Sequence, residues 1–115
     1  MPKTAELTVD LKQLAQAWNE TLPLMLHPSD KSSVEADEKF PNVLHIHIIT
    51  EGHSQYSFDF RCTYVDSREV KVEVVDVERD GATTDERRAM IQTLIEDYMR
   101  HIHECAQRLK GMTNP

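Results

Sequence analysis

Within residues 54–65, apolar and polar side chains alternate strictly from Tyr56 to Tyr64, and this stretch constrains the fold more than any other. Its apolar positions fall on every second residue: Tyr56, Phe58, Phe60, Cys62 and Tyr64. The positions between them are polar: Ser57, Asp59, Arg61 and Thr63. Successive side chains of a β-strand point to opposite faces, so the pattern predicts a strand with one aromatic, buried face and one polar face.

Two further segments carry strand patterns, one before this stretch and one after it. Residues 43–50 alternate histidines with the apolar side chains of Leu44, Ile46 and Ile48. Residues 69–78 place valines first on one parity and then on the other, as Val70, Val72 and Val74 followed by Val75 and Val77. The change of parity at Val74–Val75 predicts a β-bulge or a partly covered outer face.

The pairing of the strands follows from the rule that facing residues share one face of the sheet. A three-residue loop at Asp66–Arg68 sets Tyr64, Cys62 and Phe60 opposite Val70, Val72 and Val74. A loop at Glu51–His53 sets Ile48, Ile46 and Leu44 opposite Tyr56, Phe58 and Phe60. The sequence therefore predicts a three-stranded antiparallel meander over residues 43–79.

Helical periodicity precedes the sheet. A first helix of about residues 5–26 is predicted by apolar residues at spacings of three and four: Leu7, Leu11, Leu14, Trp18, Leu22 and Met25. Thr8 or Thr4 is the expected N-cap. Pro23 lacks an amide hydrogen, so we expect the helix to kink or end near Thr21 or Leu22. Residues 28–41 are rich in Ser, Asp, Glu and Lys and predict a mobile loop.

A long C-terminal helix follows the sheet over residues 84–110. Thr83 and Glu86 form a capping box at its start, and Gly111 is the expected stop. The apolar stripe of this helix is longer than the predicted strands. The part of the stripe that extends past the sheet must therefore be covered either by the first helix or by a second copy of the chain. The predicted fold is a single α+β domain, residues 1–115, with the order α-β-β-β-α and both helices packed on one sheet face.

Composition limits the classes of function. The chain has 115 residues, with 20 acidic and 13 basic residues and a formal net charge of −7. This balance disfavours nucleic-acid binding, which depends on clustered Lys and Arg. No apolar run is long enough to span a bilayer, no signal-peptide core is visible, and two cysteines do not make a disulfide framework. We therefore expect a cytoplasmic protein without membrane contact.

The predicted registers gather charged side chains on the polar sheet face. His45 is expected opposite Asp59 and Arg61 opposite Glu73, with His47 and Lys71 nearby. These six residues form a candidate interaction patch. A histidine held by a carboxylate is suited to general-base chemistry or to pH sensing. No nucleophile or oxyanion-binding cradle accompanies the pair, so we expect no catalytic residues.

A metal site is not expected, although His101, His103 and Cys105 follow one another closely. His101 and Cys105 share one helix face and His103 points elsewhere, so the helix offers two ligands where structural zinc needs four. Cofactors are not expected either. The chain has three glycines, Gly52, Gly81 and Gly111, at predicted turns or a helix end, so a glycine-rich phosphate loop is missing.

These features predict a small, non-enzymatic protein-binding or regulatory module that acts through a protein partner or as a homodimer. The expected dimer contacts are Val75, Val77, Ile102 and Leu109. One alternative is an acidic decoy that occupies a nucleic-acid-binding protein through the 28–41 loop and the first-helix carboxylates. Another is a small metal- or pH-sensing protein or enzyme that uses His45 with Asp59, or His101 with Cys105.

Overall fold

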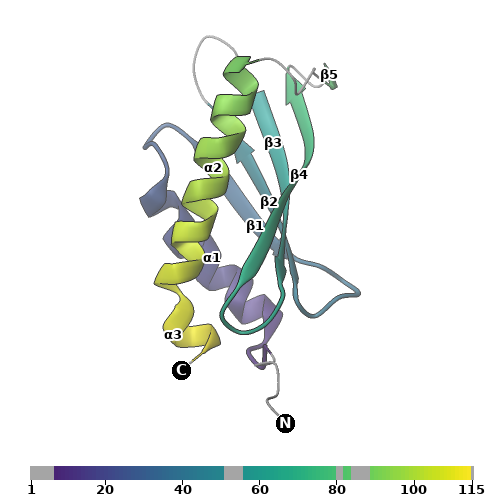
Figure 1. Cartoon of the computed structure of the whole chain (residues 1–115), viewed down its shortest axis with the longest axis vertical. Helices are drawn as coiled ribbons and strands as arrows, with labels where there is room; N and C mark the ends of the chain where they lie inside the picture. The colour runs from purple at the N-terminus through teal and green to yellow at the C-terminus, as the bar shows by residue number, and fades with distance from the viewer. Residues whose placement is uncertain (1–6, 51–55, 80–81, 84–88, 115) are drawn as a thin grey trace.

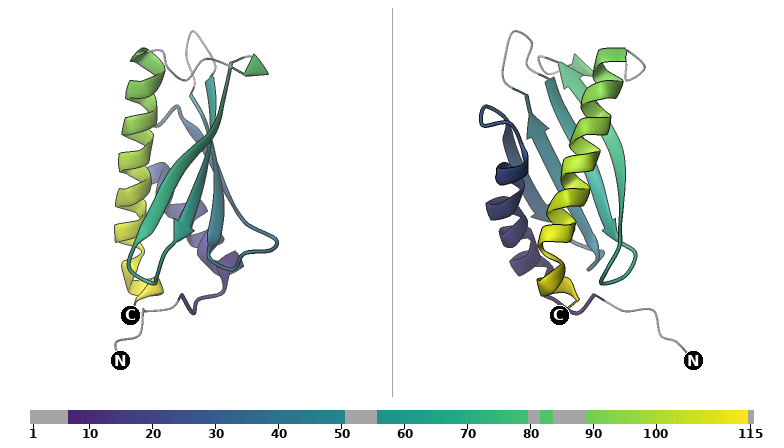
Figure 2. Two further views of the ribbon diagram at one scale, coloured as in Figure 1. Left: turned by 45° about the vertical axis from the view of Figure 1, so that its right-hand side comes forward. Right: turned by 60° about the vertical axis from the view of Figure 1, so that its left-hand side comes forward.

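Two helices lie side by side on one face of an antiparallel β-sheet, which is the predicted two-layer α+β arrangement (Figure 1, Figure 2). The computed structural model describes residues 7–50, 56–79, 82–83 and 89–114. Its elements in chain order are α1 (Leu11–Met25), β1 (Lys31–Ala36), β2 (Val43–Ile49), β3 (Tyr56–Tyr64), β4 (Val70–Arg79), β5 (Ala82–Thr83), α2 (Ala89–Arg108) and α3 (Lys110–Thr113). Within these described ranges, no helix combines the length and apolar character needed to cross a membrane.

The prediction of a three-stranded sheet is wrong. In the described part of the chain the strand order is β1-β2-β3-β4-β5. The additional long strand, β1, lies inside the segment 28–41 that was expected to be a loop. β5 adds only a short pairing with Glu78 and Arg79 at the end of β4. The sequence of β1 has a single β-branched apolar residue, Val34, so its strand form depends on pairing rather than on local propensity.

The predicted pairing of β3 with β4 is confirmed. Phe60, Cys62 and Tyr64 oppose Val74, Val72 and Val70. The N–H of Val65 donates to the carbonyl of Glu69 at 2.9 Å, which closes the predicted three-residue loop. The predicted bulge is also present: Phe60 pairs with Val74 but Asp59 pairs with Asp76, so Val75 is the extra residue. Beyond this point the side chains of β4 exchange faces.

The predicted pairing of β2 with β3 is wrong by two residues. Leu44, Ile46 and Ile48 oppose Cys62, Phe60 and Phe58. A shift of two keeps every side chain on its face, so alternation could not distinguish the two registers. The N–H of Thr50 donates to the carbonyl of Tyr56 at 2.9 Å. The expected loop at Glu51–His53 lies outside the described residues.

The helix ends differ from the predicted ones. The N-cap of α1 is Asp10, whose carboxylate accepts from the N–H of Lys12 at 3.4 Å. The helix includes Pro23 and continues to Met25. At the other end of the chain α2 ends at Arg108, and Gly111 lies inside α3 rather than at the stop of the long helix. The capping box at Thr83 and Glu86 extends outside the described residues.

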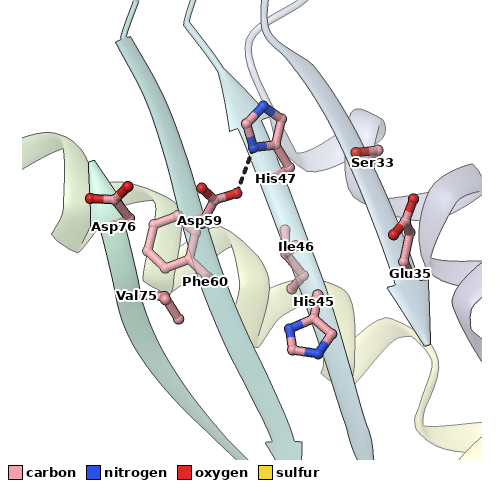
Figure 3. A pocket seen from close by; sticks show the side chains of 9 residues that line it. All are labelled: Ser33, Glu35, His45, Ile46, His47, Asp59, Phe60, Val75 and Asp76. Atoms are coloured by element: carbon pink, nitrogen blue, oxygen red, sulfur yellow. Dashed lines mark hydrogen bonds and ion pairs between the residues drawn. The ribbon is translucent and has the colours of Figure 1, made fainter. Parts of the chain in front are cut away.

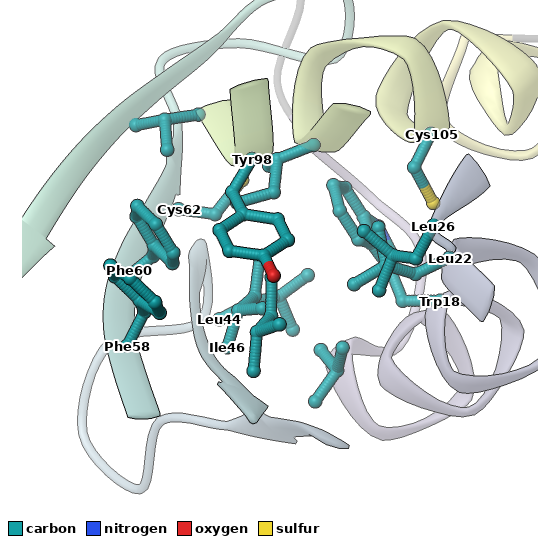
Figure 4. Packing of buried hydrophobic residues seen from close by; sticks show 14 of the residues in the cluster. Trp18, Leu22, Leu26, Leu44, Ile46, Phe58, Phe60, Cys62, Tyr98 and Cys105 are labelled. Carbon is teal, nitrogen blue, oxygen red and sulfur yellow. The ribbon is translucent and has the colours of Figure 1, made fainter. Parts of the chain in front are cut away.

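The core lies between the aromatic face of β3 and the two long helices (Figure 4). The ring of Tyr98 on α2 lies edge-on to Phe58, with centroids 5.2 Å apart, and 6.4 Å from Phe60. On α1, the buried indole N–H of Trp18 donates to the hydroxyl of Tyr64 at 3.2 Å. Because α1 packs beside α2, the first helix covers the excess of the long apolar stripe.

The outer edge of β1 is closed by a side chain from α1. The Asn19 amide nitrogen donates to the Val34 carbonyl at 2.8 Å, and the Asn19 amide oxygen accepts from the Val34 N–H at 2.8 Å. The N–H of Asp37 donates to Val43 on β2, so odd-numbered residues of β1 bond to β2 and even-numbered ones point away. Asn19 therefore takes the place of a neighbouring strand at Val34.

Replacing Asn19 tests how much this contact stabilises β1. Asn19→Ala removes both bonds to Val34, and we expect the free energy of unfolding to fall by about 1–3 kcal/mol. Asn19→Asp keeps the acceptor for the Val34 N–H but turns a carboxylate oxygen toward the Val34 carbonyl, so it should lower stability as well. Urea denaturation measures the loss, and amide hydrogen exchange should speed up at Val34. Unchanged exchange at Val34 together with wild-type stability would show that the strand forms without the amide.

Candidate functional site

The sheet face turned away from both helices, called the outer face below, carries a depression of about 580 Å³. Its lining side chains come from β1, β2, β3 and β4 (Figure 3). The lining residues are Ser33, Glu35, His45, Ile46, His47, Asp59, Phe60, Val75 and Asp76. Val75, the bulge residue, is 50% exposed and gives the depression an apolar wall. The depression thus combines carboxylates, imidazoles and one exposed aliphatic side chain.

His47 and Asp59 form the tightest contact in the depression. They are direct neighbours on β2 and β3, and His47 Nδ1 lies 2.6 Å from Asp59 Oδ1 (Figure 3). A carboxylate only accepts, so Nδ1 carries the hydrogen and Nε2 is left for another contact. Both side chains are about 40% exposed, at 40% and 39%. The predicted pair of His45 with Asp59 is wrong, because the register of β2 is shifted by two residues.

His45 instead contacts the loop that joins β1 to β2. Its Nε2 lies 2.6 Å from Asp37 Oδ1, while Asp37 Oδ2 accepts from the N–H groups of Lys39 and Phe40, both at 2.8 Å. The bond to His45, with the N–H groups of Phe40 and Lys39, lowers the pKa of Asp37 from 3.8 to about 2. This one carboxylate therefore organises the loop, and the loop exposes the ring of Phe40.

Three carboxylates gather beside His47. Oxygen atoms of Asp59, Asp76 and Glu78 lie within 4.8 Å of one another. Asp59 and Asp76 are direct cross-strand neighbours, an arrangement that costs stability because like charges repel. Asp76 Oδ1 also accepts from the N–H of Val77 at 2.9 Å. Among the described residues, this group has the oxygen ligands that a hard cation prefers, and it gives the depression a negative charge.

The other residues of the predicted patch share the outer face. Arg61 lies opposite Glu73 as predicted, and Lys71 lies opposite Thr63. Of the six patch residues, His45, His47 and Asp59 line the depression. Arg61, Lys71 and Glu73 lie outside its lining.

The predicted dimer contacts are largely inside the protein. Val77 and Ile102 have no exposed surface, at 0% each, and belong to the core. Val77 turns inward because the bulge at Val75 reverses the faces of β4. Leu109 is partly buried against the same core. Of the four predicted contacts, only Val75 is an exposed surface residue.

Four residues near the depression were missed by the sequence reasoning. Ser33, Glu35 and Asp37 come from the segment that was expected to be a loop, where nothing in the local pattern indicates a strand. Asp76 reaches the outer face because of the bulge. The double valine at Val74–Val75 was the available signal, since a bulge there moves each later even-numbered residue outward.

His101 and Cys105, the alternative metal-ligand pair, lie in different surroundings on α2. His101 Nδ1 lies 3.0 Å from Glu104 Oε1, while Cys105 is buried in the core. Burial raises the pKa of the Cys105 thiol, and of the Cys62 thiol, to about 12. Metals bind the thiolate form, which burial disfavours here. Both cysteines are free thiols.

The outer face also places a serine, a histidine and an aspartate side by side on neighbouring strands. Ser33, His47 and Asp59 stand in one row across three strands, but Ser33 makes no described hydrogen bond to His47. Strand backbone groups are directed along the sheet, so none is aimed above Ser33 to hold an oxyanion.

Comparison with family models, with curated proteins and with solved structures finds no match for this chain.

Asp37 should make stability depend on pH. Its folded pKa is depressed, so its contribution is complete above the ordinary value of 3.8 and is lost as the pH falls through about 2. We expect Asp37→Asn to lower stability at pH 7 and the difference from the wild type to shrink as the pH falls toward about 2, measured by urea denaturation at several pH values. Glu38→Gln removes an exposed charge from the same loop as a control. The same pH profile in both variants would contradict a specific role.

The two thiols should be unreactive in the folded protein. Their pKa values of about 12 leave almost no thiolate at pH 8, and the core blocks access. We expect a chromogenic disulfide reagent to label neither cysteine in native conditions and both in guanidinium chloride. Rapid labelling of a native thiol would show that the core opens near that residue.

Proposed function

We propose that this chain is a cytoplasmic protein-binding module without enzymatic activity, and that its outer face binds a basic segment of a regulatory partner. The observation that carries the proposal is the outer-face depression, because it joins an exposed aliphatic wall to a negative cluster. The carboxylates of Asp59 and Asp76 suit a Lys or Arg head group. Val75 suits the aliphatic stem of the same side chain.

The overall charge supports the same class of partner. A net charge of −7 attracts basic surfaces over a distance and speeds their encounter. Both helices cover the opposite sheet face, so a partner can approach the outer face across all four long strands (Figure 2). The two free, buried thiols are consistent with a reducing compartment.

The acidic decoy is the second function that the geometry favours. Its expected surface was the 28–41 segment, and Glu35 of that segment borders the depression while Asp37 anchors the adjacent loop. A nucleic-acid-binding protein is one kind of basic partner. The identity of the captured partner therefore separates the decoy from a general regulatory module.

A charge-matched capture experiment tests the outer face. The bait is the wild type, Asp59→Asn/Asp76→Asn, or the control Glu20→Gln/Glu96→Gln, which removes the same charge from the exposed helix surfaces. We expect one protein from the source cell to bind the wild type and the control. The Kd between this partner and the chain, measured with purified components, should rise at least about tenfold for Asp59→Asn/Asp76→Asn.

Binding should also weaken at high salt, because exposed charges are screened. Equal affinity of the partner for the two double variants would overturn the proposed site. An identified partner that binds DNA or RNA, and that releases nucleic acid when the chain binds, would favour the decoy.

A further inference from the structure

The two edges of the sheet differ in how their backbone groups are satisfied. At β1 the Asn19 amide bonds to Val34. At β4, among the described residues, only Ala82–Thr83 pairs with the outer edge, and it reaches only Glu78 and Arg79. The stretch Val70–Val74 therefore presents an unpaired strand edge, which is a template for another strand.

The direction of the β4 backbone groups follows from its hairpin. Val65 bonds to Glu69, so Glu69, Lys71 and Glu73 direct their backbone groups toward β3. The alternate residues, Val70, Val72 and Val74, direct their N–H and carbonyl groups outward. Regular pairing stops at Val75, where the bulge begins. The available edge is thus a short regular segment whose midpoint is Val72.

We propose that two copies of the chain pair antiparallel through this edge, around a two-fold axis at Val72. Val72 of one copy then lies opposite Val72 of the second copy, and Val70 lies opposite Val74 of the second copy. Each of these pairs exchanges two hydrogen bonds, since all three residues point their backbone groups outward. The valine side chains stay on the helix-covered face and meet valines.

Charge complementarity selects this register. It places Lys71 of each copy opposite Glu73 of the other, on the outer face, and each Glu73 is already opposite Arg61 of its own copy. Sliding the register by two residues in one direction sets Lys71 opposite Lys71. Sliding it in the other direction sets Glu73 opposite Glu73. Both neighbouring registers are disfavoured by like charges directly across the pair.

This inference goes beyond the proposed function and does not depend on it. Pairing at the edge leaves the outer face open, so loss of the dimer does not remove the depression. A lysine and a bulge on an edge strand also serve in other proteins to prevent pairing. The oligomeric state of the full chain decides between the two roles.

The test uses charge reversal in the full-length chain. Sedimentation equilibrium should show the wild type as a dimer at tens of micromolar. Lys71→Glu and Glu73→Lys each set like charges opposite one another, and each should weaken self-association by about tenfold or more. A mixture of the two variants restores both opposite-charge pairs and should form a heterodimer with the wild-type affinity.

Two controls keep the result specific. Lys12→Glu reverses an exposed charge on α1 and should leave the dimer unchanged. Urea denaturation confirms that each variant is folded, which matters for Glu73→Lys because Arg61 lies opposite. A monomeric wild type would overturn the proposal and assign Lys71 to edge protection. The register that sets Lys71 opposite Glu73 would be overturned by either of two results. One is a dimer whose affinity neither charge reversal changes, and the other is a mixture of the two variants that associates no more tightly than each variant alone.

Discussion

The aromatic face of β3 holds both helices to the sheet, and the rest of the structure depends on this contact. Phe58 and Phe60 pack against Tyr98 of α2, and Tyr64 accepts the hydrogen bond from Trp18 of α1. A buried Phe side chain contributes about 1.5–3 kcal/mol through removal from water. Because both helices use the same face, most charged side chains of the four long strands lie on the opposite face of the sheet.

The bulge on β4 determines the chemistry of that opposite face. The extra residue Val75 reverses the alternation, so Val77 enters the core and Asp76 moves outward beside Asp59. Two carboxylates directly across a strand pair repel each other. Departures from local consistency of this kind are expected at functional sites, where binding outweighs stability. The repulsion between Asp59 and Asp76 supports the proposal that this face binds a cationic group.

The sequence predicted those features that depend on alternation, and it missed those that depend on contacts far apart in the chain. The β3 strand and the bulge follow from side-chain parity, and the β3–β4 register follows from parity together with the short loop at Asp66–Arg68. The β2–β3 register does not, because a slip of two residues preserves parity, and this error assigned His45 rather than His47 to Asp59. β1 was missed because its sequence, with Ser32 and Ser33 at its centre, is polar and lacks alternation. Its strand form depends on β2 and on Asn19, which no local pattern reveals.

The two proposals reinforce each other through the geometry of a continuous sheet. Strands that pair edge to edge share their faces, so the depressions of two paired copies would open on the same side. Both copies would then present Asp59 and Asp76 to one partner surface. A partner with two basic segments would bind the second after the first as an intramolecular step, which raises the overall affinity without any new contact. The open edge at Val70–Val74 would in this way convert one modest charged site into a bivalent one.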